Sequence, residues 1–543
     1  MFVCKNCGGN IRFDIKSQKL VCGICNSSFE PEEIQKENDS VDYDFFEATI
    51  FTCPQCGAAI MCEDNEAASF CTYCASSTVL TSRISREKKP DYIIPFKKTK
   101  KECIDEFRKI TKKAIFAPSQ LRDAKVLEQF KAIYIPYWYF NVKQEALFTV
   151  NGMEEYKDYT SSMKGLNYYN VSGYVEGEYD GICRDGSYDF SDDLGERIAP
   201  YFTAEKKKFY PSYLSGFYAD TTDIPSKVYE HEAREIANDI ARDVLEGEAS
   251  RGDYKDMKVY LSNDEATKQF NTQVTSKRAL LPVWFMSFRK KDKVAYMTVN
   301  GQTGAAATDF PISIVKYLMG VLAATILLTI PVTFIMMMFR YDAAKLFQDV
   351  TLFISMLSFI IYFIEIKRLQ TKDLHSEDAG KFYQKYKVVY IKDKKKNVEL
   401  KNFIRANIVD LSASTVQVFI LIFYILCIAG IFSPDANGIL LRIGMSIGNL
   451  FMAGVCAYRS FGFKKSSRYI GLITGSLAVV IVLAIQIIDP ISKFGNMLGG
   501  AVLSLGCFVM FIDLVLYHNE LTMRKPSLLR RRGGDEIADS VDL

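Results

Sequence analysis

Histidine is scarce in this chain of 543 residues, which has three, far apart in the sequence: His231, His375 and His518. Tryptophan is rarer still, with two residues. The sequence also lacks a Gly-rich phosphate loop, a nucleophile elbow and a pair of carboxylates at a plausible site. These absences argue against histidine-ligated metal catalysis and Ser–His–Asp chemistry. We therefore predict that the protein is not an enzyme, and no small-molecule substrate is evident.

Charge of one sign is also lacking, because the formal net charge is only +3. Bulk charge therefore does not indicate a polyanion-binding protein. Hydrophobic residues make up 49% of the chain although 24% is charged, and this average combines a polar N-terminal part with an apolar C-terminal part. The length is too great for one ordinary domain. We expect a multidomain protein with two small β zinc ribbons, an α+β cytosolic domain and an all-α six-helix transmembrane bundle.

Cysteine is plentiful, and eight of the 14 cysteines form two constellations of the same spacing. Two C-x₂-C pairs separated by 14 residues occur twice, and a Cys₄ shell suits Zn²⁺. No signal peptide is expected before them, so the compartment is reducing and disulfides are disfavoured. Gly8 and Gly57 follow a pair directly and permit a positive φ. We predict two structural zinc ions per chain, in ribbons at 1–35 and 49–85, with eight ligands: Cys4, Cys7, Cys22, Cys25, Cys53, Cys56, Cys71 and Cys74.

The charge of the ribbons bears on their partners. Residues 1–90 contain nine Lys and Arg residues and 13 Asp and Glu residues, and the segment 36–48 between the ribbons is predicted to be an acidic linker. Nucleic acid binding needs a cationic surface, because affinity comes largely from counterion release. We therefore expect the ribbons to dock proteins, and nucleic acid is an unlikely partner.

The region 90–311 is predicted to be a cytosolic α+β domain. A capping box at Thr99 and Glu102 starts one helix, and Pro225 precedes a second. Each helix precedes a strand with a Pro-x-Trp sequence and then a Thr-Val-Asn-Gly sequence, in which Asn-Gly favours a hairpin turn. The similar order suggests two repeats, at 90–155 and 205–311, although chance similarity between short strand-like sequences is the alternative.

The region 312–517 contains six apolar segments that are long enough to span a bilayer. They cover approximately 315–339, 347–366, 413–433, 438–458, 468–488 and 494–517. Basic residues concentrate in the loop 367–412, in the loop after the fourth segment and in the tail 518–543. The positive-inside rule then predicts a multi-pass protein of the cell membrane with both termini cytoplasmic. The bilayer lipid is thus a predicted partner.

Charged residues are few in this apolar region, and Glu365, Arg442, Asp489 and Asp513 all lie near segment ends. Their interfacial position makes solvation there the simplest interpretation. Pro331 is the main interruption of an apolar segment. A transporter usually needs polar groups at the midplane or broken helices, so transport receives little support.

Several aromatic motifs, together with the cysteine pairs, make the chain resemble a known protein family. The order of motifs is two Cys₄ ribbons, Asp91–Phe96, Tyr134–Trp138, Tyr210–Phe217 and Leu281–Trp284, followed by apolar spans. This arrangement resembles the bacterial zinc-ribbon membrane proteins of the YdjG type, described as containing TFIIB-type zinc ribbons. The resemblance covers most of 1–311, and it implies association with a phage-shock-like membrane-stress system whose partners include PspA-type and SPFH-domain proteins. It provides eight zinc-ligand positions and no catalytic residue.

Three hypotheses for function follow. In the first, the protein is a membrane scaffold whose cytosolic ribbons and α+β domain dock protein partners in an envelope-stress response. The second is a transporter or channel with a regulatory zinc-ribbon head. The third is a membrane-tethered nucleic-acid-binding protein, which the acidic ribbons disfavour.

Overall fold

The computed structural model divides into two compact units. Unit 1 contains 1–112, 122–308 and 525–543, and unit 2 contains 113–121 and 309–524. The structure describes residues 2–34, 44–62, 71–76, 81–157, 164–187, 190, 192–249, 258–260, 266, 268–290, 293–308, 310–323, 327, 343–375, 436–460, 470–488 and 492–523. Each unit is a separate body with its own hydrophobic core.

The smaller sheet of unit 1 belongs to the first predicted ribbon. It contains three antiparallel strands in the order β1-β2-β3, with the bounds Ile11–Asp14, Lys19–Cys22 and Ser28–Phe29. Apolar and polar residues alternate along β1, and its Ile11 and Phe13 are buried. Its partner β2 buries Leu20 and Cys22.

The larger sheet of unit 1 has 12 strands among the described residues. Its main path runs β10-β7-β13-β8-β11-β5-β4-β6, while β9, β12, β14 and β15 pair off this path. The strands are β4 (Phe45–Thr52), β5 (Ala59–Met61), β6 (Thr81–Lys88), β7 (Tyr92–Ile93), β8 (Lys131–Lys157), β9 (Lys164–Asp185), β10 (Lys207–Lys208), β11 (Tyr218–Asp220), β12 (Lys258–Tyr260), β13 (Asn271–Lys290), β14 (Lys293–Asn300) and β15 (Ala306–Thr308). β4 begins at Phe45, inside the range predicted as the linker.

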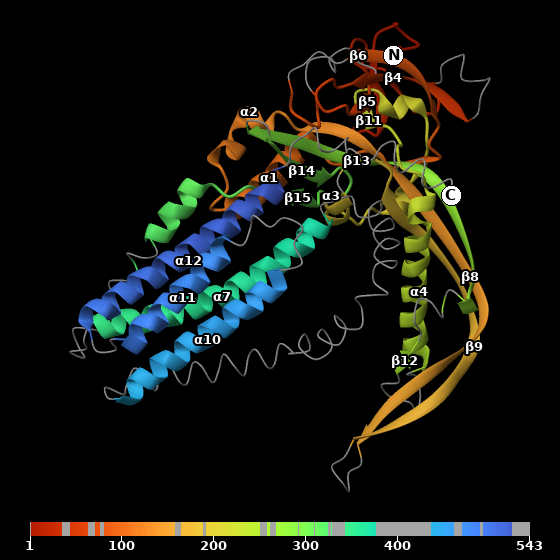
Figure 1. Ribbon diagram of the computed structural model, residues 1–543. Helices are drawn as coiled ribbons and strands as arrows, with labels where there is room; N and C mark the ends of the chain where they lie inside the picture. The colour runs from red at the N-terminus through yellow and green to blue at the C-terminus, as the bar shows by residue number, and fades with distance from the viewer. Residues whose placement is uncertain are drawn as a thin grey trace. The chain divides into compact units, whose positions relative to one another are not determined.

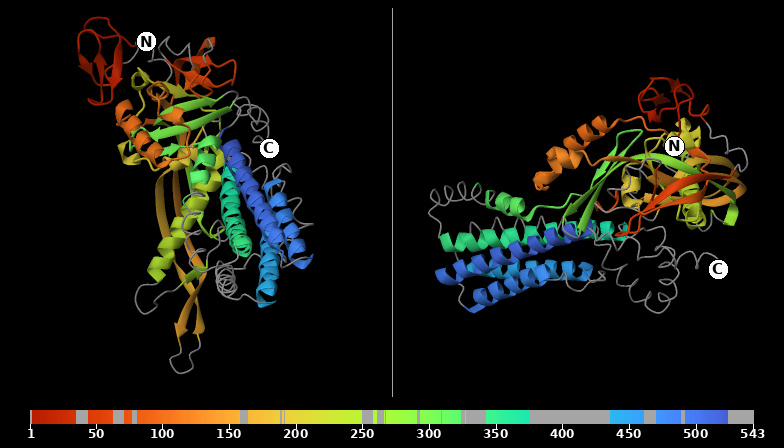
Figure 2. Two further views of the ribbon diagram at one scale, coloured as in Figure 1. Left: turned by 90° about the vertical axis from the view of Figure 1, so that its left-hand side faces the viewer. Right: turned by 90° about the horizontal axis from the view of Figure 1, so that it is seen from above.

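Strands β8 and β9 form a long antiparallel hairpin, visible in Figure 1 and in the left view of Figure 2. Helix α4 (Lys227–Ala249) runs along one face of this hairpin, where Phe148, Val150 and Ala241 are buried together. The predicted hairpin turn at Asn151 is wrong, because β8 continues through this position and pairs Asn151 with Asn170. Cross-strand pairing along the whole length of β9 overrides the local turn preference.

The two Pro-x-Trp segments occupy equivalent places on β8 and β13. These strands pair with each other, and each has a short parallel neighbour: β11 beside Ile133 of β8, and β7 beside Ala279 of β13. The indole of Trp138 donates to the carbonyl of Ile224 before α4 (2.7 Å), and that of Trp284 donates to Lys98 before α1 (2.8 Å). The two segments therefore make similar contacts, and the duplication of 90–155 and 205–311 stays a prediction.

Unit 1 also contains helices. The predicted capping box is present, because the Thr99 backbone N–H donates to the Glu102 carboxylate (2.8 Å) at the start of α1. The α-helices are α1 (Lys100–Lys113), α2 (Ala124–Leu127), α3 (Asp192–Arg197) and α4, and short 3₁₀ turns cover Thr203–Glu205 and Pro211–Leu214. A further 3₁₀ turn, Ser119–Arg122, lies mostly in the segment 113–121 of unit 2.

Unit 2 is helical, and its four long helices lie side by side in Figures 1 and 2. They are α7 (Ala343–His375), α10 (Ala436–Ser460), α11 (Ile470–Ile488) and α12 (Lys493–Thr522). Both α7 and α11 contact both α10 and α12, so the four helices enclose a common interior. A shorter apolar helix covers Ile314–Ala323.

Three of these helices are long and apolar enough to cross a membrane, in the described part of the chain. They contain Phe347–Ile366, Ile470–Ile488 and Lys493–Thr522, and they indicate membrane association. The predicted bundle of six spans is not shown. The fourth predicted span coincides with the shorter apolar stretch Arg442–Ala457, and most of the first and all of the third lie outside the described residues, as does most of the predicted basic loop 367–412.

Candidate metal centres

The same turn forms at all four C-x₂-C pairs. In each, the residue after the second cysteine donates its backbone N–H to the carbonyl of the first cysteine, at 2.7 to 3.0 Å. That residue has a positive φ in every case: 72° at Gly8, 57° at Asn26, 77° at Gly57 and 54° at Ala75. The predicted left-handed conformation of Gly8 and Gly57 is therefore confirmed. A local backbone geometry repeated four times points each pair of thiols in one direction.

The eight predicted ligands come together as two Cys₄ groups, with the Sγ atoms of each group within 4.8 Å of one another. In the first group, which we name site 1, Cys4 and Cys25 are 3.6 Å apart and Cys7 and Cys22 are 3.5 Å apart. In site 2, the corresponding distances are 3.7 Å for Cys53 and Cys74 and 3.7 Å for Cys56 and Cys71. A tetrahedral Zn–S₄ centre with bonds of about 2.3 Å requires Sγ atoms about 3.8 Å apart. Both groups could therefore hold a metal ion such as zinc.

Site 1 is open to solvent on one side, because Cys7 and Cys25 are exposed while Cys4 and Cys22 are buried. The Cys25 Sγ lies 3.2 Å from the hydroxyl of Ser27. Hydrogen bonding from the Ser27 side chain and backbone lowers the pKa of Cys25 to about 6. This environment favours the thiolate, which is the form that binds metal.

The first ribbon is attached to the large sheet through the segment 210–217. The Phe13 ring packs against the rings of Tyr213 (5.4 Å between centroids) and Phe217 (6.1 Å). The Ser215 hydroxyl donates to the Ile11 carbonyl (2.5 Å), and the Ser212 hydroxyl donates to the Pro31 carbonyl (2.6 Å). The aromatic motif that contributed to the family resemblance thus holds site 1 in place.

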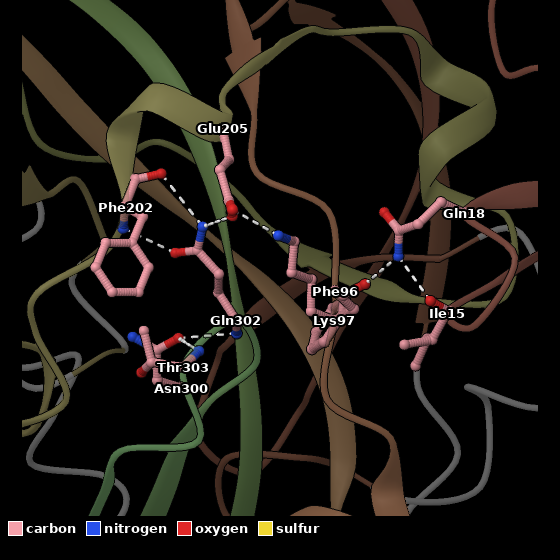
Figure 3. A network of polar contacts seen from close by, with 9 residues as sticks. All are labelled: Ile15, Gln18, Phe96, Lys97, Phe202, Glu205, Asn300, Gln302 and Thr303. Carbon is pink, nitrogen blue, oxygen red and sulfur yellow. Dashed lines mark hydrogen bonds and ion pairs between the residues drawn. The ribbon is translucent and has the colours of Figure 1, made fainter.

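A second attachment is shown in Figure 3, where the Gln18 amide donates to the carbonyls of Ile15 and Phe96, both at 2.7 Å. Next to Phe96, the Lys97 ammonium pairs with Glu205 at 2.6 Å. The Gln302 side chain donates to the same carboxylate, so hydrogen bonds and an ion pair connect the residues around this attachment.

Close packing also fixes Phe96. A Cβ atom at Gly301 would lie 2.5 Å from the Phe96 ring, so this glycine is required for steric reasons. The ring stacks on Phe217, with 4.8 Å between centroids. Ribbon 1 therefore rests on a tightly packed part of the large sheet.

Site 2 is built into the large sheet, and all four of its cysteines are buried. Strand β5, between the two cysteine pairs, joins the sheet by pairing Met61 with Ala219 of β11. The Tyr73 hydroxyl donates to the buried carboxylate of Asp220 (2.6 Å), which also accepts from Ser187. On the other side, the Ser287 hydroxyl donates to the Thr72 carbonyl at 2.7 Å. Side chains from distant parts of unit 1 therefore hold the second cysteine pair.

Several of these residues could not be found from the sequence. Tyr73 and Asp220 are 147 positions apart, and nothing in the pattern of either segment relates them. Asp180, which is uninformative in isolation, accepts hydrogen bonds from Tyr139 (2.5 Å) and Lys206 (3.0 Å). Among the other described cysteines, Cys103, Cys456 and Cys507 are buried like small apolar side chains, whereas Cys62 and Cys183 are half-buried.

Comparison with known proteins gives one informative similarity. A protein of Bacillus subtilis (strain 168) with the name "Uncharacterized protein YdjG" is 26% identical to this chain over 315 residues, which are 58% of this chain and 90% of that protein. The similarity gives weak support to a YdjG-like family. No family model matches the chain. No solved structure matches it either.

Proposed function

We propose that the protein is a membrane-anchored scaffold whose unit 1 docks protein partners in an envelope-stress response. The eight cysteines would hold two zinc ions in this proposal. A Cys₄ shell leaves no coordination position for water or substrate, so the ions would stabilise the fold and take no part in chemistry. The candidate spans of unit 2 would anchor the scaffold in the cell membrane, with both termini cytoplasmic.

The observation that carries the proposal is a face of the β8–β9 hairpin that is exposed among the described residues. Leu147 pairs with Tyr174, and Met153 pairs with Tyr168, on the face opposite to α4. Leu147 is 82% exposed and Tyr168 is 74% exposed. Large apolar side chains grouped on an exposed face mark interaction sites more often than single ones do. We name Leu147, Tyr168, Tyr174, Glu145 and Glu176 the hairpin face.

The charge on the hairpin face defines the partner. Glu145 and Glu176 lie directly opposite each other on the paired strands, next to Leu147 and Tyr174. Like charges in this position repel, and a cation between them would relieve the repulsion. The face therefore fits a protein that presents an apolar surface bordered by Lys or Arg. The family resemblance directs the search to PspA-type and SPFH-domain proteins.

The test measures binding of the full-length protein in nanodiscs to two purified proteins from the same bacterium, one PspA-type and one with an SPFH domain. The first variant, Leu147→Ser, removes the apolar contact, and the second, Glu145→Lys with Glu176→Lys, reverses the charge. We expect each to lower the affinity about tenfold or more, corresponding to about 1.4 kcal/mol. The charge reversal should also remove most of the salt dependence.

Asp105→Lys is the matched control, because Asp105 is an exposed acid on α1, away from the hairpin. It should bind as the wild type does. Equal affinity of all variants would exclude the hairpin face as the docking site, and absence of binding to both proteins would reject them as partners.

A further inference from the structure

The interior of unit 2 is polar at one end. Six uncharged polar side chains are buried there, with exposed fractions of 0 to 3%. We name them the polar layer: Gln348 and Ser355 on α7, Ser446 and Asn449 on α10, Gln486 on α11 and Asn496 on α12. Gln486 lies close to the last residue of α11, and Asn496 close to the first residue of α12. The layer is therefore near the end of the bundle at which α11 ends and α12 begins.

Contacts across the bundle join the polar layer. The Ser446 hydroxyl donates to the Gln486 side chain (3.0 Å), which connects α10 to α11. The Asn449 amide donates to the Ser355 hydroxyl (2.8 Å) and to the Leu352 carbonyl (3.2 Å), which connects α10 to α7. A Cβ atom at Gly499 would lie 3.0 Å from the Gln348 amide nitrogen, so α7 and α12 approach closely at this glycine.

Within the part of the chain that the structure describes, five amide atoms of the polar layer are buried without a hydrogen-bond partner. They are Nε2 and Oε1 of Gln348, Oδ1 of Asn449, Nε2 of Gln486 and Nδ2 of Asn496. Buried polar atoms in proteins are nearly always hydrogen-bonded, and an unpaired one is costly in an apolar environment. Because the unpaired atoms lie on four helices around one interior, we infer that a further molecule with hydrogen-bonding groups binds among them.

The unpaired atoms indicate which kind of molecule would bind to them. Gln348 presents both a free donor and a free acceptor, so an ion of either sign would meet one unfavourable dipole. The half-buried charges on α7 and α10 neutralise each other, because Arg442 binds Asp349 through two contacts of 2.7 and 3.1 Å. A molecule with donors and acceptors but no net charge therefore fits best.

We propose that the polar layer is a binding site for a small uncharged solute that carries hydroxyl groups, with glycerol as the probe. This inference does not depend on the scaffold function of unit 1. It assigns to the helices of unit 2 a binding site made of uncharged side chains, which the few ionisable residues in this part of the sequence do not indicate.

The test measures thermal unfolding of the full-length protein in nanodiscs over a series of glycerol concentrations. Binding to the folded state raises Tm along a curve that is steep at low glycerol concentration and logarithmic above the dissociation constant, and this curve adds to the linear increase that excluded osmolytes produce in any protein. We expect the curved part in the wild type and in Ser504→Ala, which removes an exposed hydroxyl of α12. It should be lost in Gln486→Leu and, independently, in Asn449→Leu.

A second probe makes the test independent of any variant. 1,2-Dimethoxyethane is a small molecule with ether oxygens and no hydrogen-bond donor, so it should give no curved increase of Tm in the wild type. Parallel glycerol curves for the wild type and a folded Leu variant would overturn the proposal, as would equal curved increases with both probes. In that case the polar layer holds water only.

Discussion

The two Cys₄ groups have the same cysteine spacing and the same backbone turns, yet they occupy different environments. Site 1 is at the surface, with Cys7 and Cys25 exposed, whereas every cysteine of site 2 is buried. The residue just before the last cysteine of each site shows the difference most clearly. In site 1 this residue is Ile24, which is 76% exposed, and in site 2 it is Tyr73, which is fully buried.

This difference predicts that a bound metal would have a different role at each site. Ribbon 1 has three short strands and too few residues to form a sufficient apolar core, so the metal would supply most of its stability. Site 2 belongs to a core that includes Tyr137, Phe285 and Tyr296 from distant strands. Loss of metal from site 2 would therefore damage a structure much larger than the ribbon.

The largest expected effect comes from removing one ligand of each site. Cys71→Ser should lower the main unfolding temperature of the protein by about 10 °C or more, because structural metal contributes on the order of 10 kcal/mol to folding. Cys7→Ser should leave the main transition unchanged and expose only ribbon 1 to proteolysis. Both variants should lose about one zinc ion per chain by metal analysis. Equal shifts in unfolding temperature would show that the two sites are equally integrated.

Phe13→Ala should detach ribbon 1 without removing its metal. The substitution deletes the ring that packs against Tyr213 and Phe217, at a cost of about 3 kcal/mol. Hydrogen exchange should become faster in β1–β3 while the large sheet keeps its protection. Lys16→Ala, an exposed position beside the same strand, is the control. Loss of the bound metal in Phe13→Ala would instead show that docking and metal binding are coupled.

Tyr73→Phe should lower the free energy of unfolding of unit 1 by about 2 kcal/mol. The change leaves the buried carboxylate of Asp220 without the 2.6 Å hydrogen bond from this hydroxyl. At the equivalent position of site 1, Ile24→Ala should have an effect below about 0.5 kcal/mol, because the side chain is exposed. Chemical denaturation of both variants measures this. A small effect of Tyr73→Phe would mean that other groups are sufficient to stabilise Asp220.

The smallest change in the free energy of unfolding is expected at the residue that follows the last cysteine of each site. Ala75 adopts a positive φ of 54°, which is strained for a residue with a Cβ atom. Ala75→Gly should therefore stabilise unit 1 by about 0.5–1 kcal/mol. Asn26→Gly should change stability by only a few tenths of a kcal/mol, since asparagine tolerates this conformation. Denaturant midpoints of the two variants compare them, and destabilisation by Ala75→Gly would contradict the strain argument.

Local sequence was sufficient wherever a short segment determines its own geometry. The cysteine spacing predicted two Cys₄ groups, and the glycines after two of the pairs predicted their left-handed turns. The capping box at Thr99 was also correct, because it depends on residues three positions apart. Hydropathy predicted apolar helices where the structure has α7, α11 and α12.

Long-range pairing overrode local sequence in the hairpin. Asn151 and Gly152 form a strong turn sequence, but β9 pairs with both residues and keeps β8 extended. The polar layer was missed for a related reason, because Ser, Asn and Gln are unremarkable in an apolar helix until four helices bring them together.

The sequence by itself determined that the chain has two Cys₄ groups, a strand-rich polar part and an apolar helical part. The metal-binding turns depend on a few adjacent residues, and helix-forming apolar runs depend on composition, so both can be read locally. Only the tertiary structure decided that one site is buried in the large sheet and the other is at the surface. Burial depends on which distant segments contact the turn, and these contacts, such as Tyr73 with Asp220, arise only when the whole sheet has formed.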